Sequence, residues 1–233
     1  MIEAEWWEYD SLDELADAVA GDVGFIIDSA VDARGASLIA VPGGTTGPKI
    51  FPKLAAQSLP WKKVAIIPTD DRLVPMDDER SNVRAIAKTF LPLGARVVPI
   101  AADIADYRLA GNSADARLQD LPWPPDLVWL GVGKDGHTAS IFPGPDMQDA
   151  LDAPKTRRAV GVMPDPLPQD APVARVTLTR AAILSARTIL ITITGDDKRE
   201  LLEQAIADGQ SSKLPIGRVL AEAEQPIDIH WCP

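Results

Sequence analysis

The chain has 233 residues, of which 46% are hydrophobic and 24% charged, a composition typical of a soluble globular enzyme. Its formal net charge of −11 argues against sequence-independent nucleic-acid binding, which needs a basic surface. The single Cys232 excludes an intrachain disulfide and a cysteine metal site, and the length supports a single domain over residues 1–233.

Apolar segments alternate with amphipathic ones along the chain. Ser11 and Glu14 fit a capping box that starts a long helix ending near Val31. The expected strands are a segment before Ser11, then 36–41, 63–68, 96–100, 127–133, 158–163, 174–179, 188–194 and 227–231. Further helices are expected at about 49–57, 82–91, 112–119, directly after 127–133, and from residue 195 or 196. This alternation predicts a layered α/β/α sandwich with a mostly parallel, Rossmann-like sheet.

A turn rich in glycine and threonine, VPGGTTGP, follows the strand at 36–41. Gly43 and Gly44 let the backbone approach a ligand closely. Thr45 and Thr46 supply hydroxyl and N–H donors at a helix N-terminus, which is a ready site for phosphate. The segment matches neither the Walker A motif nor GxGxxG, so a plain tight turn is the alternative interpretation.

Three charged residues, Asp70, Asp71 and Arg72, follow the strand at 63–68. Two carboxylates and an arginine at the carboxyl end of a strand could orient a hydroxylated substrate. The alternative is a solvated acidic loop with a surface ion pair. Ser81 or Asn82 is expected to cap the helix that follows.

The segment DGHTASIFPG, residues 135–144, directly follows the apolar run at 127–133. We expect a strand, a glycine turn and then a helix whose first turn contains His137. Histidine is the residue type that titrates unaided near neutral pH, so His137 is a candidate general base. The only other histidine, His230, lies in the apolar run IDIHWC, where a packed or edge-strand histidine is expected.

Two cations complete the set of candidate residues. Arg175 opens the strand at 174–179, and a surface role is the default for it. Lys198 lies in the first turn of a helix, where a cation opposes the macrodipole and a bound anion would relieve that cost. In a doubly wound sheet, all of these segments are expected to project from the same edge.

The segments GGTTGP, DDRLVP with the later SN, LGVGKDGHTASIFPG and RVTLT together resemble 6-phosphogluconolactonase, in order and at the expected intervals. The resemblance implies a single α/β domain akin to glucosamine-6-phosphate deaminase. It also implies hydrolysis of a lactone in the oxidative pentose phosphate pathway, without a metal or other cofactor. One departure is that the family usually has glutamate where this chain has Asp71.

The substrate implied by the resemblance is 6-phospho-D-glucono-1,5-lactone. We expect His137 to act as general base and then acid, with Asp135 orienting the ring or capping the helix. Arg72 is expected on the carbonyl or hydroxyl side and Asp70 on the sugar hydroxyls. The phosphate is assigned to Arg175, Lys198 and the glycine turn, which contributes Gly43, Gly44, Thr45 and Thr46.

Three rival functions are open to a chain of this kind. In the aminosugar deaminases a glutamate that handles protons occupies the position of Phe142, which argues against that activity. A sugar-phosphate sensor of a bacterial regulator would carry a DNA-binding module, and no basic helix precedes the first strand. A dinucleotide-dependent oxidoreductase would need GxGxxG after a strand.

The sequence also leads to expectations about the location and the assembly of the protein. The chain shows no signal peptide and no apolar run near the length of a membrane span, so a cytoplasmic location without membrane partners is expected. The resemblance implies a monomer whose partner is a small sugar-phosphate lactone.

Overall fold

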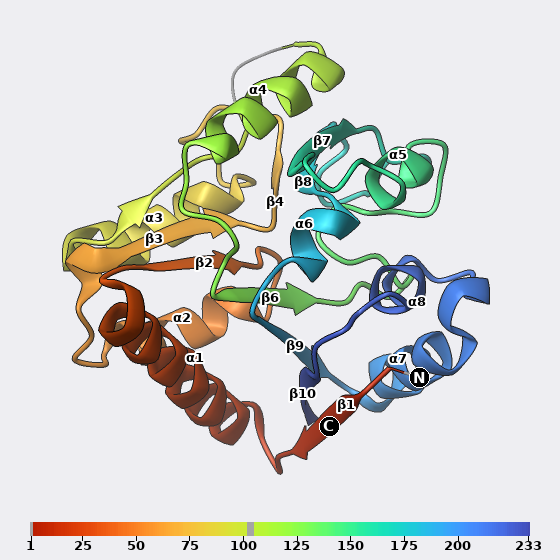
Figure 1. Ribbon diagram of the computed structural model, residues 1–233. Coiled ribbons are helices and arrows are strands. Elements are labelled where there is room, and N and C mark those ends of the chain that lie inside the picture. The colour runs from red at the N-terminus through yellow and green to blue at the C-terminus, as the bar shows by residue number, and fades with distance from the viewer. Residues whose placement is uncertain (1, 102–104) are drawn as a thin grey trace.

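A seven-stranded parallel sheet forms the centre of the molecule in the computed structural model, which describes residues 2–101 and 105–233 (Figure 1). The strands in sheet order are β1 (Ala4–Glu8), β10 (Ile227–Cys232), β9 (Thr188–Thr194), β6 (Leu127–Gly131), β2 (Ser37–Val41), β3 (Val64–Pro68) and β5 (Arg96–Val97). Every neighbouring pair in this sheet is parallel. The predicted layered, mostly parallel α/β fold is therefore confirmed.

Helices cover both faces of this sheet, which explains why all five residues of β2 are buried. One apolar core lies between the sheet and the helices α1 (Leu12–Arg34), α2 (Gly47–Ala55) and α3 (Asn82–Phe90). The core on the other face includes residues of α4 (Tyr107–Gln119), α5 (Met147–Leu151), α6 (Arg180–Leu184), α7 (Asp196–Asp208) and α8 (Pro215–Leu220).

Helix α1 begins at the predicted cap, Ser11, with a variant of the capping box in which the Asp10 N–H takes the place of the Ser11 backbone N–H. The Glu14 backbone N–H donates to Ser11 Oγ over 3.2 Å, and the Glu14 carboxylate accepts from the Asp10 N–H. The helix ends at Gly35, whose φ of 81° is left-handed and whose N–H donates to the Val31 carbonyl. It therefore runs three residues past the predicted end.

A second, antiparallel sheet has the order β4 (Asp70–Arg72), β8 (Arg175–Leu178) and β7 (Ala159–Val162). Asp70 pairs with Thr177, and Arg72 pairs with Arg175. The expectation that all polar segments project from one edge of the main sheet is therefore wrong for β8, which lies in the second sheet. β4, by contrast, does follow the carboxyl end of β3. The second sheet lies in a separate layer beside the main sheet (Figure 1). Its residues Asp70, Arg72 and Arg175 line a cavity together with residues at the ends of the main-sheet strands.

The helix expected at His137 is also absent, because the backbone reverses twice in this segment. Gly136 has a φ of 77° and Ala139 a φ of 49°, both in the left-handed region that interrupts a right-handed helix. A tight turn follows, in which the Ile141 N–H donates to the Thr138 carbonyl over 2.9 Å. The next helix, α5, begins only at Met147.

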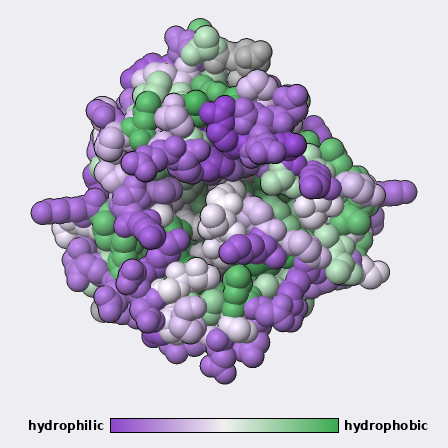
Figure 2. All heavy atoms as spheres, turned by 180° about the vertical axis from the view of Figure 1, so that it is seen from behind, coloured by the Kyte–Doolittle hydropathy of each residue, from purple (hydrophilic) through white to green (hydrophobic). Residues whose placement is uncertain are grey.

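Hydrophilic residues dominate the face of the molecule seen in Figure 2, with smaller hydrophobic areas between them. Within 2–101 and 105–233, none of the helices combines the length and the apolar character needed to cross a bilayer.

Candidate active site

A cavity of about 230 Å³ opens where β2, β6 and β9 end and the second sheet approaches them. The polar side chains on its wall come from segments that are far apart in the chain. Of the ten predicted site residues, nine line this cavity: Gly43, Gly44, Thr45, Thr46, Asp70, Arg72, His137, Arg175 and Lys198. Asp135 is the exception, and it contacts His137. Parallel sheets place ligands at this edge, so the cavity is the candidate active site.

His137 and Asp135 form a hydrogen-bonded pair at the edge of the cavity. Asp135 Oδ1 contacts His137 Nδ1 and also accepts from the His137 backbone N–H over 3.2 Å. Burial alone would raise the pKa of Asp135, but its hydrogen bonds and charge interaction with His137 outweigh this and lower it. An ionised Asp135 accepts a hydrogen bond from the Nδ1–H group of the ring, which leaves the lone pair of Nε2 free to take a proton.

Two neighbours fix the position of this imidazole. The ring of Phe142 stacks on it, with 4.2 Å between the centroids and an angle of 28° between the planes. On another side lies Gly133, where a Cβ atom would collide with the imidazole and with Asp135. The Gly133 N–H also donates to the His137 carbonyl over 2.9 Å. The histidine is therefore held by backbone, carboxylate and aromatic contacts together.

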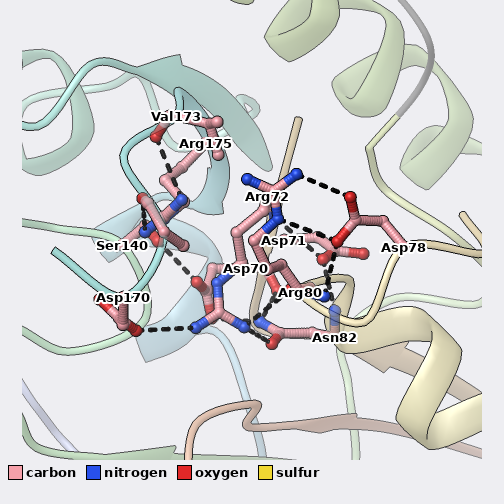
Figure 3. Close-up of polar contacts among 11 residues, drawn as sticks. Asp70, Asp71, Arg72, Asp78, Arg80, Asn82, Ser140, Asp170, Val173 and Arg175 are labelled. Atoms are coloured by element: carbon pink, nitrogen blue, oxygen red, sulfur yellow. Dashed lines mark hydrogen bonds and ion pairs between the residues drawn. The ribbon is translucent and has the colours of Figure 1, made fainter. Parts of the chain in front are cut away.

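Asp70 connects the histidine loop (135–144) to the second sheet. Ser140 Oγ donates to Asp70 Oδ2 over 2.6 Å (Figure 3). The Ser140 N–H donates to Thr177 Oγ1 over 3.1 Å. Asp70 is only 8% exposed. It nonetheless lines the cavity, so its carboxylate is placed to accept from a ligand hydroxyl as well.

Arg72 lies on the same wall. Its Nη1 donates to the Arg80 carbonyl over 3.1 Å and also contacts Asn82 Oδ1. Its Nη2 lies 3.8 Å from the Asp170 carboxylate (Figure 3). The Nε atom is buried without a hydrogen-bond partner. The close contacts of the Arg72 guanidinium are thus made mainly by Nη1.

Asp71, by contrast, is fully buried and is not among the residues that line the cavity. Its carboxylate accepts from the backbone N–H groups of Arg72, Asn82 and Val83 at 2.8, 2.6 and 3.1 Å, and from Ser81 Oγ. Burial raises the pKa of Asp71 to about 6, against the lowering effect of these hydrogen bonds. Asp71 is therefore an anchor for the N-terminus of α3.

Arg175 and Lys198 add two more cations to the wall. The default expectation of a surface role for Arg175 is wrong, because this residue is only 2% exposed. Its guanidinium donates to the carbonyls of Ala171 and Val173 at 2.9 and 3.1 Å. Burial lowers the pKa of both cations; Arg72 lowers that of Arg175 further, and Lys134 does the same for Lys198.

The glycine turn lies between β2 and α2. Gly44 has a left-handed φ of 69°, and Gly43 packs so closely on Asn82 that a Cβ atom would overlap its side chain. Thr46 occupies the N-cap position of α2 without a side-chain capping bond. Its hydroxyl and the N-terminus of α2 are therefore placed to bind an anion.

Sequence reasoning did not select several other polar residues that line the cavity: Asn82, Ser140, Asp170 and Thr192. Ser140 lies inside the DGHTAS segment, and its position three residues after His137 is the signal that could have identified it. The sequence predicts Ser81 or Asn82 as the cap of α3, and in the structure Ser81 has that role.

His230 lies outside this cavity, on β10 in the interior of the sheet. It is 1% exposed, and its Nδ1 lies 2.9 Å from the Tyr9 hydroxyl. Burial lowers the pKa of His230 to about 4, so the ring is neutral near pH 7. The prediction of a packed histidine is confirmed, in a central strand.

The chain is similar to known proteins along nearly its whole length. The family model of glucosamine-6-phosphate isomerases and 6-phosphogluconolactonases matches residues 10–231. Proteins named 6-phosphogluconolactonase from Mesorhizobium japonicum and Rhizobium meliloti are 38% and 39% identical to the chain. These alignments cover 98% and 94% of this chain and 95% and 94% of the relatives. A crystal structure of a 6-phosphogluconolactonase from Shewanella baltica matches with a TM-score of 0.90 at 31% identity, covering 99% of this chain and 98% of that one.

Proposed function

The chain belongs to the family of glucosamine-6-phosphate isomerases and 6-phosphogluconolactonases, and we propose that it acts as a 6-phosphogluconolactonase. In this proposal the enzyme hydrolyses 6-phospho-D-glucono-1,5-lactone to 6-phospho-D-gluconate, a step of the oxidative pentose phosphate pathway. The relatives that carry this name cover nearly the whole chain, which supports the assignment.

The observation that carries the proposal is that His137, which is paired with Asp135, lines one cavity with Arg72, Arg175 and Lys198. The substrate is an ester with a dianionic phosphate on a distant carbon. Such a molecule needs a base and a cation for the oxyanion at its ester end, and further cations at its phosphate end. The residues that line this cavity include groups of each kind.

The first chemical step is attack of water on the lactone carbonyl. His137 Nε2 removes a proton from the water while Asp135 holds the Nδ1–H and stabilises the imidazolium that forms. The resulting hydroxide forms a new C–O bond, and the carbonyl electrons move onto the oxygen. Arg72 is the cation assigned to this tetrahedral oxyanion.

The second step opens the ring. The oxyanion electrons re-form the carbonyl, the bond from the carbonyl carbon to the ring oxygen breaks, and the imidazolium returns its proton to that oxygen. The product is an open-chain acid, which loses its proton to solvent. No metal or covalent intermediate is needed for this sequence of proton transfers.

Binding of the phosphate fixes the ester against the base. We assign it to Lys198, Arg175 and the N–H and hydroxyl groups of the glycine turn, where a helix N-terminus adds to the positive field. Asp70 is assigned to sugar hydroxyls, because its carboxylate is an acceptor on the same wall. The distant phosphate then contributes to the rate by orienting the carbonyl.

A coupled assay tests the proposal. Glucose 6-phosphate dehydrogenase generates the lactone in situ, and a downstream dehydrogenase reports the acid. We expect addition of the protein to speed delivery of the acid well above the spontaneous background. A rate equal to the background would contradict the lactonase assignment.

The family also includes aminosugar isomerases, so a second substrate serves as a discriminating control. Phe142 stacks on His137 and offers no carboxylate for proton transfer. We therefore expect no ammonia from glucosamine 6-phosphate. Release of ammonia at a rate comparable with lactone turnover would favour the deaminase instead.

The cytoplasmic location and the monomeric state of the protein stay predictions.

A further inference from the structure

Asn82 is a buried polar residue that the mechanism above does not use. It is only 4% exposed, yet it lines the cavity beside Arg72 and Asp70. Resting on the lactonase function proposed above, we infer that Asn82 is a positioning residue for Arg72. Its amide holds the guanidinium in the orientation that receives the oxyanion, without neutralising the guanidinium charge.

The contacts of Asn82 are divided between two functional residues. Its Oδ1 accepts from Nη1 of Arg72, and its Nδ2 donates to the Asp70 carbonyl over 2.7 Å (Figure 3). A longer contact of 3.4 Å joins Nδ2 to Asp70 Oδ1. One amide therefore sets the relative position of the cation and the carboxylate on this wall.

Arg72 has few other restraints, which makes this contact important. Its Nε is buried without a partner, and its Nη2 lies 3.8 Å from the Asp170 carboxylate, which is exposed to solvent. Apart from its contact with Asn82, the Arg72 side chain donates a hydrogen bond of 3.1 Å to the Arg80 carbonyl. Loss of the Asn82 amide would leave the guanidinium free to reorient.

The amide itself is held rigidly from two sides. The Asn82 backbone N–H donates to the buried carboxylate of Asp71 over 2.6 Å, which fixes the start of α3. On the side-chain end, Gly43 packs against the amide and leaves no room for a Cβ atom there. Asn82 is thus the first residue of α3 and contacts both the glycine turn and β4.

The charges of Arg72 and Asp70 explain why the side chain at position 82 is a neutral amide. A carboxylate in this position would pair with Arg72 and remove the positive field that an oxyanion needs. It would also place a second negative charge beside Asp70. An amide keeps the geometry of an acceptor and a donor without either effect, which is the chemical reason for asparagine.

A double-mutant cycle tests the inference in the coupled lactone assay. We expect Asn82→Ala to lower kcat roughly 10–100-fold, the range for loss of a hydrogen bond to a charged group, with KM little changed. In an Arg72→Ala background, the same change should alter kcat by less than about twofold, because the two residues act as one unit. Asn82→Asp should lower kcat more than Asn82→Ala.

Ser81→Ala provides the matched control. It removes the N-cap of the same helix and a contact to Asp71, but no contact to Arg72. It should lower Tm while kcat changes less than about twofold. If Asn82→Ala does not fold, Asn82→Ser replaces it, because serine is tolerated at a helix start.

The outcomes separate the two proposals. A wild-type protein with no turnover above background overturns the lactonase function and the positioning role with it. An active wild type in which Asn82→Ala costs the same factor with and without Arg72 overturns the positioning role alone. A folded Asn82→Ala protein with wild-type kcat does the same.

Discussion

Gly133 lies against the imidazole of His137 so closely that a methyl group on Gly133 would overlap the ring. The same methyl would approach the carboxylate of Asp135. Gly133 lies two residues after the end of β6, and its N–H donates to the His137 carbonyl. The absence of a side chain just after this strand therefore creates the space in which the base and its carboxylate partner meet.

Gly133→Ala is expected to displace the His137 ring and lower kcat by roughly 10-fold or more, since small misplacements of reacting groups are costly. Gly21→Ala in α1 is the control, because a Cβ atom there meets no other atom within 4 Å. It should leave kcat unchanged. A Gly133→Ala protein with wild-type kinetics would show that the ring position is not critical.

Removal of the base itself tests the central step. His137→Ala should lower kcat by about 10²–10⁴-fold while leaving the fold intact, the range for loss of a general base. Asp135→Asn should also lower kcat, because an amide no longer fixes the proton on Nδ1. Steady-state kinetics and circular dichroism measure both effects. Near-wild-type turnover by folded His137→Ala would remove the base assignment.

Lys198→Ala is expected to raise KM for the phosphorylated lactone by roughly 10–100-fold, the range for loss of a hydrogen bond to a charged group. The kcat value should change much less, because the phosphate is remote from the ester. Lys155→Ala, at an exposed position outside the cavity, is the matched loss of one positive charge. Equal KM values for the two variants would separate Lys198 from phosphate binding.

Asp71 predicts a pH dependence of stability. Burial raises its pKa to about 6 in the folded protein, above the ordinary value of 3.8, so the folded state binds this proton more tightly than the unfolded chain does. The stabilisation from Asp71 is therefore complete below about pH 4 and decreases as the pH rises through 6. An asparagine at position 71 has no proton to titrate in this range, so an Asp71→Asn variant lacks this pH dependence.

The free energy of unfolding of the wild type, minus that of Asp71→Asn, should thus fall between about pH 4 and pH 7, by at most about 3 kcal/mol. Urea denaturation of both proteins at several pH values measures this difference. A difference that stayed constant across the range, or grew with pH, would contradict the raised pKa.

Local patterns in the sequence were sufficient for much of this fold. The helix cap at Ser11, the alternation of buried strands with amphipathic helices, and the turn at Gly43 and Gly44 depend on neighbouring residues, and each is present. The same is true of the order strand, glycine turn, histidine around His137. Short-range periodicity and turn chemistry carry this information because they act within a few residues.

Pairing between distant segments determined the second sheet and the contacts among the site residues. β4 pairs with β8 although about 100 residues separate them, and no periodicity in either segment reports its partner. This pairing buries Arg175 and brings Asp70 to Ser140 of the histidine loop. Two left-handed residues, Gly136 and Ala139, replaced the expected helix with turns. Residue type and local spacing thus determined which groups are present, whereas contacts between distant segments decided which of them meet, because burial and pairing are properties of the whole packed chain.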